Sequence, residues 1–202
     1  MRKPEVQMKH IVTMALMLTL GVASVYAQQH PAKYAQQHPV KMVFSGTGAA
    51  SVVNLHMPNT ITSEENIAGN GTLGPFTFRN IRASAATPEP SSTCSGPNEL
   101  FFPSVAGAGV FRFQDGSLLK VNLTQGGDCI DFTALVAHCT FTFQITGGTG
   151  RFKDASGDLT LTETDLPVLA DALHNPVFFA DTGEFTGTVS GVAREADRQE
   201  EQ

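Results

Sequence analysis

The sequence contains no tryptophan, only two tyrosines and little positive charge. Its 202 residues include 13 Lys and Arg against 19 Asp and Glu, which gives a formal net charge of −6. This balance excludes a protein that binds nucleic acid through its phosphates, because no basic run follows the N-terminal segment. Only 16% of residues are charged and 41% are hydrophobic, so a disordered acidic chain and a coiled coil are also excluded.

A long apolar run occurs only near the N-terminus. Basic residues precede a mostly apolar stretch at 11–25, which is shorter than the roughly 20 residues of a membrane-spanning helix. Val25 and Ala27 then place small residues at the two positions that a signal peptidase inspects. We therefore expect residues 1–27 to be a secretory signal peptide and the protein to be secreted or periplasmic. No membrane association is expected after cleavage.

A tandem repeat follows, in which residues 26–33 and 34–41 differ at one position. His30 and His38 of the two copies are candidate ligands of a metal-chelating tail. Two histidines on a flexible chain make a weak metal site, however. The prolines of the repeat favour extended chain, so residues 28–41 are expected to be a polar linker.

From residue 42 to 193, apolar and polar residues alternate with the period of a β-strand. Phe76 and Phe78 share one face of such a run, and turn residues such as Asp115 and Gly116 separate the runs. Seven or eight strands in sequence, mostly joined by short turns, predict one all-β domain, built as a sandwich or a closed barrel.

One short helix is expected in this domain. Asp165 can cap its start and Pro167 suits its first turn, so the helix is predicted to continue to Leu173. Residues 194–202 form a charged segment without an apolar face, and we expect them to be a solvated tail.

The most specific motif is a glycine-rich turn. Gly147, Gly148 and Gly150 supply backbone angles that other residues avoid, and Phe152 is expected to fill one end of the core. With its Arg-Phe and Ala-Ser-Gly continuation, the turn resembles the strand-turn-strand signature of the allene oxide cyclase and dirigent barrel superfamily and its bacterial secreted relatives. The resemblance is strongest over residues 115–161. It implies an eight-stranded antiparallel barrel, and a homo-oligomer, since plant members are often trimers.

The family's chemistry is not carried over to named residues. Its cyclases use a carboxylate, an Asn, a Cys and a Tyr, and its dirigent proteins use acidic residues and a Tyr. Here both tyrosines, Tyr26 and Tyr34, precede the barrel, so no catalytic residue is assigned. No cofactor is expected either, because the G-x-G-x-x-G pattern at 69–74 leads into Pro75 and a strand rather than a helix.

Three cysteines occur in the sequence. Cys94 and Cys129 lie in polar segments and are predicted to form a disulfide, which fits an exported protein. Cys139 shares the phase of Phe141 and Phe143, so it is expected to be a buried free thiol. A bridge between Cys129 and Cys139 is the alternative.

Other polar residues are candidate ligands of a metal or of a cavity. Asp128, Asp131, His138 and His56 could gather around a metal, but their spacing matches no known metal loop, so no metal site is expected. Within the strands, the polar residues that could face a cavity are Asn80, Arg112 and Glu184.

The expected function follows from a barrel with an apolar interior. Such a barrel is either filled or binds one small apolar ligand, and Phe178 and Phe179 are the predicted ligand-binding residues at its mouth. We expect a secreted, non-catalytic barrel that binds a small apolar ligand or is structural. The alternatives are an isomerase or cyclase acting on a reactive apolar substrate, and a surface-interaction module. An enzyme would need a cavity-facing polar group with a perturbed pKa.

Overall fold

The computed structural model describes residues 36–53, 55, 57–172 and 175–193. The predicted signal peptide, the charged tail, His30 and His56 lie outside the described residues. The first strand begins at His38, four residues before the position at which the sequence pattern starts the barrel. Val40 accounts for this difference, because its side chain is buried and its backbone pairs with Gly187.

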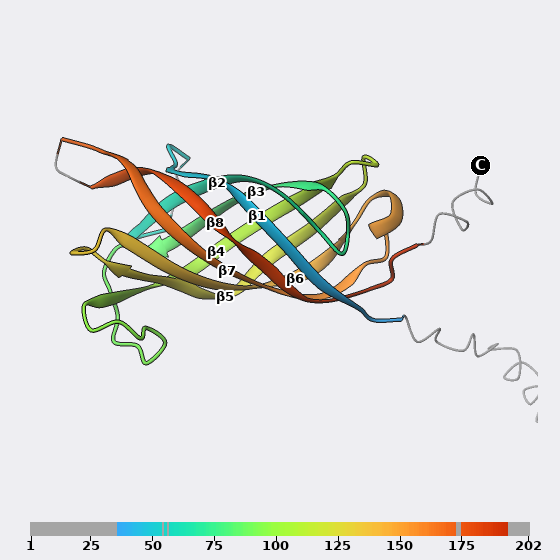
Figure 1. Ribbon diagram of the computed structural model, residues 1–202. Coiled ribbons are helices and arrows are strands. Elements are labelled where there is room, and N and C mark those ends of the chain that lie inside the picture. Colours follow the sequence, from blue (N-terminus) through green and yellow to red (C-terminus); the bar gives the residue numbers. More distant parts are fainter. Residues whose placement is uncertain (1–35, 54, 56, 173–174, 194–202) are drawn as a thin grey trace, which may run out of the picture. The chain divides into compact units, whose positions relative to one another are not determined.

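The described chain forms a closed barrel of eight antiparallel strands, as predicted (Figure 1). Each strand pairs with the next in sequence, and β1 also pairs with β8, which closes the wall. Within the described part of the chain, no helix reaches the length and apolarity that crossing a bilayer requires. The strands are β1 (His38–Ala50), β2 (Thr60–Gly71), β3 (Phe76–Ala85), β4 (Glu99–Phe113), β5 (Leu118–Asp131), β6 (Val136–Gly148), β7 (Ser156–Ala170) and β8 (Pro176–Ser190).

The helix predicted from Asp165 is wrong. Strand β7 continues through this segment to Ala170, and the helical segment of the described chain is a single 3₁₀ turn, η1 (Gly150–Phe152). Pro167 pairs with Phe179 of β8 beside an irregularity in the ladder, where a missing N–H donor is tolerated. Pairing along β8 therefore outweighed the local helix signals of Asp165 and Pro167.

One end of the barrel is closed by the glycine-rich turn between β6 and β7. Gly147 and Gly150 have φ of 98° and 57°, in the region that favours glycine. Phe152 is fully buried and its ring centroid lies 4.7 Å from that of Phe113. Arg151 covers this pair, with its guanidinium 4.9 Å from the Phe113 ring and 4.6 Å from the Phe152 ring.

The interior next to this closed end is a dry aromatic core. Phe185 lies at its centre, with ring centroids 5.3 Å from Phe44, 5.2 Å from Phe78 and 4.9 Å from Phe111. Burial of these rings supplies the main stabilising term of the fold. The largest fully buried side chains are Phe78, Phe111, Phe141, Phe143, Phe152, Phe185, Met42, Ile67, Leu119, Leu159, Leu161 and Val121.

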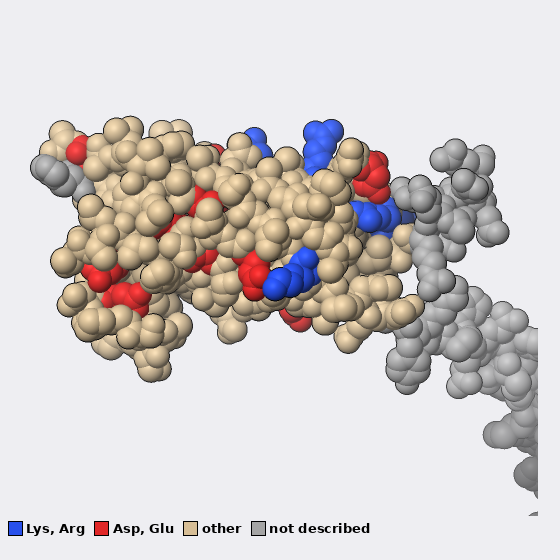
Figure 2. All heavy atoms as spheres, in the orientation of Figure 1, with Lys and Arg blue, Asp and Glu red and all other residues tan. Residues whose placement is uncertain are grey.

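Charge on the outside of the barrel is unevenly distributed. Figure 2 shows Lys and Arg on the half of the barrel where β1 begins and β8 ends, whereas the opposite end shows acidic residues and no basic ones on this face. That opposite end is formed by the loops β1–β2, β3–β4, β5–β6 and β7–β8 (Figure 1). We call it the mouth.

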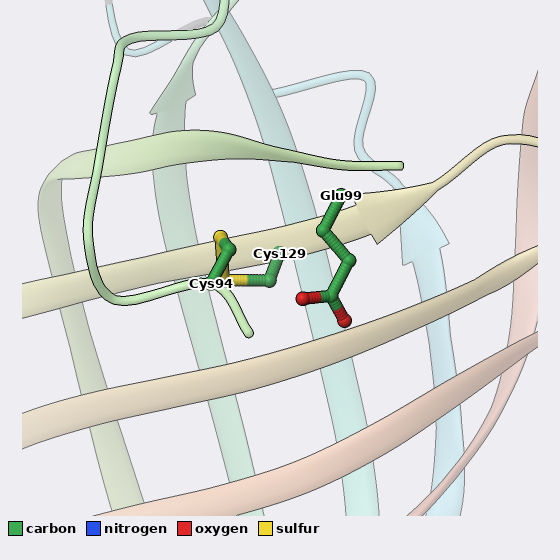
Figure 3. Close-up of side chains that lie close together, drawn as sticks. All are labelled: Cys94, Glu99 and Cys129. Atoms are coloured by element: carbon green, nitrogen blue, oxygen red, sulfur yellow. A yellow bond between two sulfur atoms is a disulfide. The ribbon is translucent and has the colours of Figure 1, made fainter. Parts of the chain in front are cut away.

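A disulfide ties the β3–β4 loop to the wall near the mouth. Cys94 and Cys129 are bonded, with Cα atoms 5.5 Å apart, as predicted (Figure 3). The carboxylate of Glu99 accepts a hydrogen bond of 2.6 Å from the Gly96 backbone N–H in the same loop. The alternative bridge from Cys129 to Cys139 is wrong, because Cys139 is free and buried within the barrel core.

Candidate ligand cavity

A cavity of about 430 Å³ opens at the mouth. Most of its walls are apolar, and its polar floor consists of Glu65, Arg82, Asp128 and Asp165. A second hollow of about 480 Å³ lies over β6, β7, β8 and β1 and is lined mainly by Thr and charged residues. Apolar and aromatic residues that line the mouth cavity include Ile61, Pro88, Leu100, Phe102, Ile130, Phe132, Leu135, Val136, Ala137, Pro167, Pro176 and Phe179.

The polar floor arises from strands whose inward positions change from apolar to polar along their length. On β3, Phe78 is followed in the same phase by Asn80 and Arg82, which are both buried. On β7, Leu161 is followed in phase by Glu163 and Asp165. Because the side chains of a strand alternate between its two faces, these polar groups must share the interior with the aromatic core.

Arg82 organises half of this floor. Its Nε and Nη2 atoms each lie 2.9 Å from Glu65 Oε1, and its Nη1 atom lies 2.6 Å from Asp128 Oδ1. The guanidinium also stacks 4.3 Å from the Phe141 ring centroid. Burial opposes its charge, but Asp128 and Glu65 outweigh that cost and raise the pKa of Arg82 well above its usual range. Arg82 is therefore a fixed cation.

Three further carboxyl groups lie beside this ion pair without an equivalent partner. Asp165 is 4.0 Å from Arg82 at its closest, while Glu163 and Asp181 are only 5% and 1% exposed. Burial raises the pKa of Asp165 to about 8. The charge of Arg82 lowers this pKa in part, and the charge of Glu65 raises it further. Burial and then Glu65 raise the pKa of Asp181 to about 6, and burial raises that of Glu163 well above its usual range. At neutral pH, Asp165 is therefore a carboxylic acid that can donate a proton.

Cys139 belongs to the same cluster. Its thiol lies 3.4 Å from Asp165 Oδ2 and donates toward it. Burial, and then Asp128 and Asp165, raise the pKa of Cys139 well above its usual range. The sulfur is consequently a thiol rather than a reactive thiolate at neutral pH.

The predicted ligand-binding residues take two different positions. Phe179 lines the cavity, whereas Phe178 is not among its lining residues and is 36% exposed. Neighbouring residues of β8 point to opposite sides of the wall, which accounts for the difference. Binding at Phe179 stays a prediction.

The other polar candidate residues are spread over both sides of the wall. Asn80 is buried and donates to Glu65 Oε2 at 2.8 Å, while Arg112 and Glu184 lie outside, the latter paired with Lys41. Asp128 and Asp131 both line the cavity, whereas His138 is exposed on the outer surface.

Sequence reasoning missed two acids of the floor, Glu65 and Asp165, and two buried acids beside it, Glu163 and Asp181. The signal that could have found them is the phase of the alternation. Leu159 and Leu161 belong to the apolar, inward-facing positions of their strand. The residues two and four positions after Leu161 are Glu163 and Asp165, so the same alternation predicts that they face inward too. The predicted helix interrupted that alternation at Asp165.

No family model and no curated protein matches the chain. A pterocarpan synthase dirigent protein is similar in structure, with a TM-score of 0.39 and 10% identity over 79% of this chain and 88% of that one. A nonspecific heme-binding cyclase that catalyses a cycloaddition during neoabyssomicin biosynthesis has a TM-score of 0.36 and 12% identity, over 93% of this chain and 84% of that one. TM-scores this low assign neither a family nor an activity to this chain.

Proposed function

We propose that this barrel binds one small, largely apolar ligand in its mouth cavity and that it acts outside the cytoplasm. The observation that carries the proposal is a cavity of about 430 Å³ with apolar walls and a small polar floor. Apolar walls bind by burying ligand surface, and a few polar groups fix the ligand's orientation. The Cys94–Cys129 disulfide supports export, because such bonds persist in oxidising compartments.

A second function, isomerisation or cyclisation of a bound substrate, is favoured by one observation. Asp165 lies on the cavity floor with a pKa of about 8, so its carboxyl group holds a proton at neutral pH. It could transfer this proton to a ligand atom and recover it when the product's new bond forms. Loss of turnover in Asp165→Asn, with ligand binding retained, would separate this enzyme from a binding protein.

Binding is tested with Nile red, an uncharged dye whose fluorescence rises in apolar surroundings. The pair Phe179→Ala and Phe178→Ala provides a matched comparison, because only Phe179 lines the cavity. We expect Phe179→Ala to change the dye affinity at least threefold and Phe178→Ala to leave it unchanged, since only the first alters the apolar wall.

Native mass spectrometry of protein purified from its own host provides the direct test. A co-purifying apolar adduct is expected. Equal dye binding by both Phe variants, together with a ligand-free native mass, would contradict the proposal and leave a structural barrel.

A further inference from the structure

Several buried oxygen atoms at the cavity floor and beside it have no hydrogen-bond donor within the described part of the chain. Among the described residues, six buried oxygens in this region have no hydrogen-bond partner. All six are acceptors when the carboxyl groups are ionised, and no nitrogen of the floor is left without a partner. Buried acceptors are normally satisfied, so a hydrogen-bond donor is missing here whenever these carboxyl groups are ionised. The atoms are Asn80 Oδ1, Asp165 Oδ1, both carboxylate oxygens of Glu163 and both of Asp181.

The formal charges of these groups also favour a ligand that carries positive charge. Five carboxyl groups, three on the floor and two beside it, surround one guanidinium, and Arg82 makes its close contacts with Glu65 and Asp128. Asp165, Glu163 and Asp181 are left without a cation within hydrogen-bond distance among the described side chains. A ligand that carries positive charge would complete this set, whereas a carboxylate ligand would meet repulsion.

Access to these acids is through the mouth. Asp165 is the acid of this group that lines the cavity, and it is only 8% exposed. The loops around the opening, residues 51–59, 86–98, 132–135 and 171–175, contain no Lys or Arg. The mouth end of the face in Figure 2 likewise shows acidic side chains and no basic ones. A cation approaching the cavity therefore meets no Lys or Arg of these loops.

We propose that the ligand is an amphiphilic amine, whose apolar body fills the mouth cavity and whose protonated amino group donates hydrogen bonds to Asp165. This inference rests on the proposed function and names the chemical class of its ligand. The cationic group supplies the donor that the orphaned Oδ1 of Asp165 lacks, and the apolar walls exclude water from the resulting ion pair. An ion pair in such surroundings is stronger than one at the surface.

Binding of the amine is coupled to the protonation of Asp165. The free protein holds a proton on this carboxyl group at pH 7, because its pKa is about 8. An ammonium group favours the ionised form, so binding releases that proton to the buffer. The charged or titratable groups that face Asp165 from the surrounding strands are Glu65 of β2, Arg82 of β3, Asp128 of β5, Cys139 of β6, Glu163 of β7 and Asp181 of β8.

The experiment compares three probes of matched size by titration calorimetry at pH 7: 4-phenylbutylamine, 4-phenylbutanol and 4-phenylbutyric acid. We expect the amine to bind at least tenfold more tightly than the alcohol, and the acid to bind most weakly. Titrations in phosphate and in imidazole, which differ in ionisation enthalpy, should show release of up to one proton with the amine and none with the alcohol.

Two variants assign the effect to Asp165. Asp165→Asn keeps the shape of the protonated side chain, and we expect it to weaken amine binding at least tenfold, to abolish proton release and to change alcohol binding less than twofold. Asp158→Asn is the matched control, because Asp158 lies on the same strand but is exposed. It should leave all three affinities unchanged.

The possible failures are distinguishable. If the alcohol or the acid binds as tightly as the amine, the amine proposal is wrong but the ligand cavity stands. If no probe binds and Nile red binding is also absent, the proposed function itself fails. If Asp165→Asn does not fold, the ranking of the three probes on the unmodified protein still decides the question.

Discussion

Asp165 shows how one residue acquires different properties from its position in a fold. An aspartate in water is ionised at neutral pH, but at the cavity floor it has lost most of its hydration. Arg82 offsets only part of that loss, because its close contacts are with Glu65 and Asp128. Retaining a proton is then the lower-energy state, which makes Asp165 a donor in the free protein.

The raised pKa of Asp165 makes the stability of the fold depend on pH. The unfolded chain loses the Asp165 proton near the ordinary pKa of 3.8, whereas the folded chain holds it to about pH 8. Between these values the folded state binds more protons, so the free energy of unfolding falls as pH rises from about 4 to 8. Asp181, with a pKa of about 6, adds to the lower part of this range.

We expect the melting temperature to be at least roughly 3 °C higher at pH 5 than at pH 8, measured by circular dichroism. Asp165→Asn should reduce this difference, and Asp158→Asn should not. A melting temperature that rises between pH 5 and pH 8 in the unmodified protein would show that these acids are ionised in the folded state.

At the scale of the element, a single strand contributes side chains to both the aromatic core and the polar floor. The inward phase of β3 begins with Phe76 and Phe78 and ends with Asn80 and Arg82, so one strand serves both the dry core and the polar floor. Facing strands make room for these large side chains with glycine. A Cβ at Gly109 of β4 would lie 2.4 Å from the Phe78 ring, which is closer than two carbon atoms can approach.

Gly109→Ala should therefore be destabilising, although its φ lies outside the left-handed region. Phe78 is fully buried, and its ring centroid lies 4.3 Å from that of Phe111, so it cannot move aside without disturbing the core. We expect a loss of about 1–3 kcal/mol in the free energy of unfolding, measured in urea. The control Ala108→Val adds atoms to the exposed face of the same strand and should change stability by less than about 0.5 kcal/mol. Equal effects of the two variants would argue against close packing at Gly109.

At the scale of the whole molecule, the barrel is packed with side chains at one end and has a cavity at the other. Phe152 and Arg151 cover the closed end, whereas the cavity opens at the mouth, where the disulfide ties the β3–β4 loop to the wall. The loop closed by Cys94 and Cys129 spans 35 residues in sequence. Restricting a chain of this length lowers the entropy of the unfolded state.

Reduction of this disulfide is expected to lower the free energy of unfolding by about 3–4 kcal/mol. The matched control is Cys94→Ser combined with Cys129→Ser, whose melting temperature should not respond to reductant. Thiol titration of the denatured protein should find one reactive group before reduction and three after it. A response to reductant in the double variant would locate the effect elsewhere.

The sequence by itself determined the class of fold. Alternation such as that of Phe141 and Phe143 is a local property of the chain, as is the glycine turn before Phe152, so both could be predicted without knowing what the strands face. The disulfide was also predictable, because Cys94 and Cys129 lie in polar segments whereas Cys139 shares the apolar phase.

The site, in contrast, depends on contacts between strands that lie far apart in sequence. Helix signals at Asp165 and Pro167 depend on the local backbone, and they lost to pairing with β8, which joins residues far apart in sequence. The pKa of Asp165 depends on groups contributed by several strands, and closure of the barrel brings them together. A buried cluster of this kind depends on distances through space, which local sequence patterns do not encode.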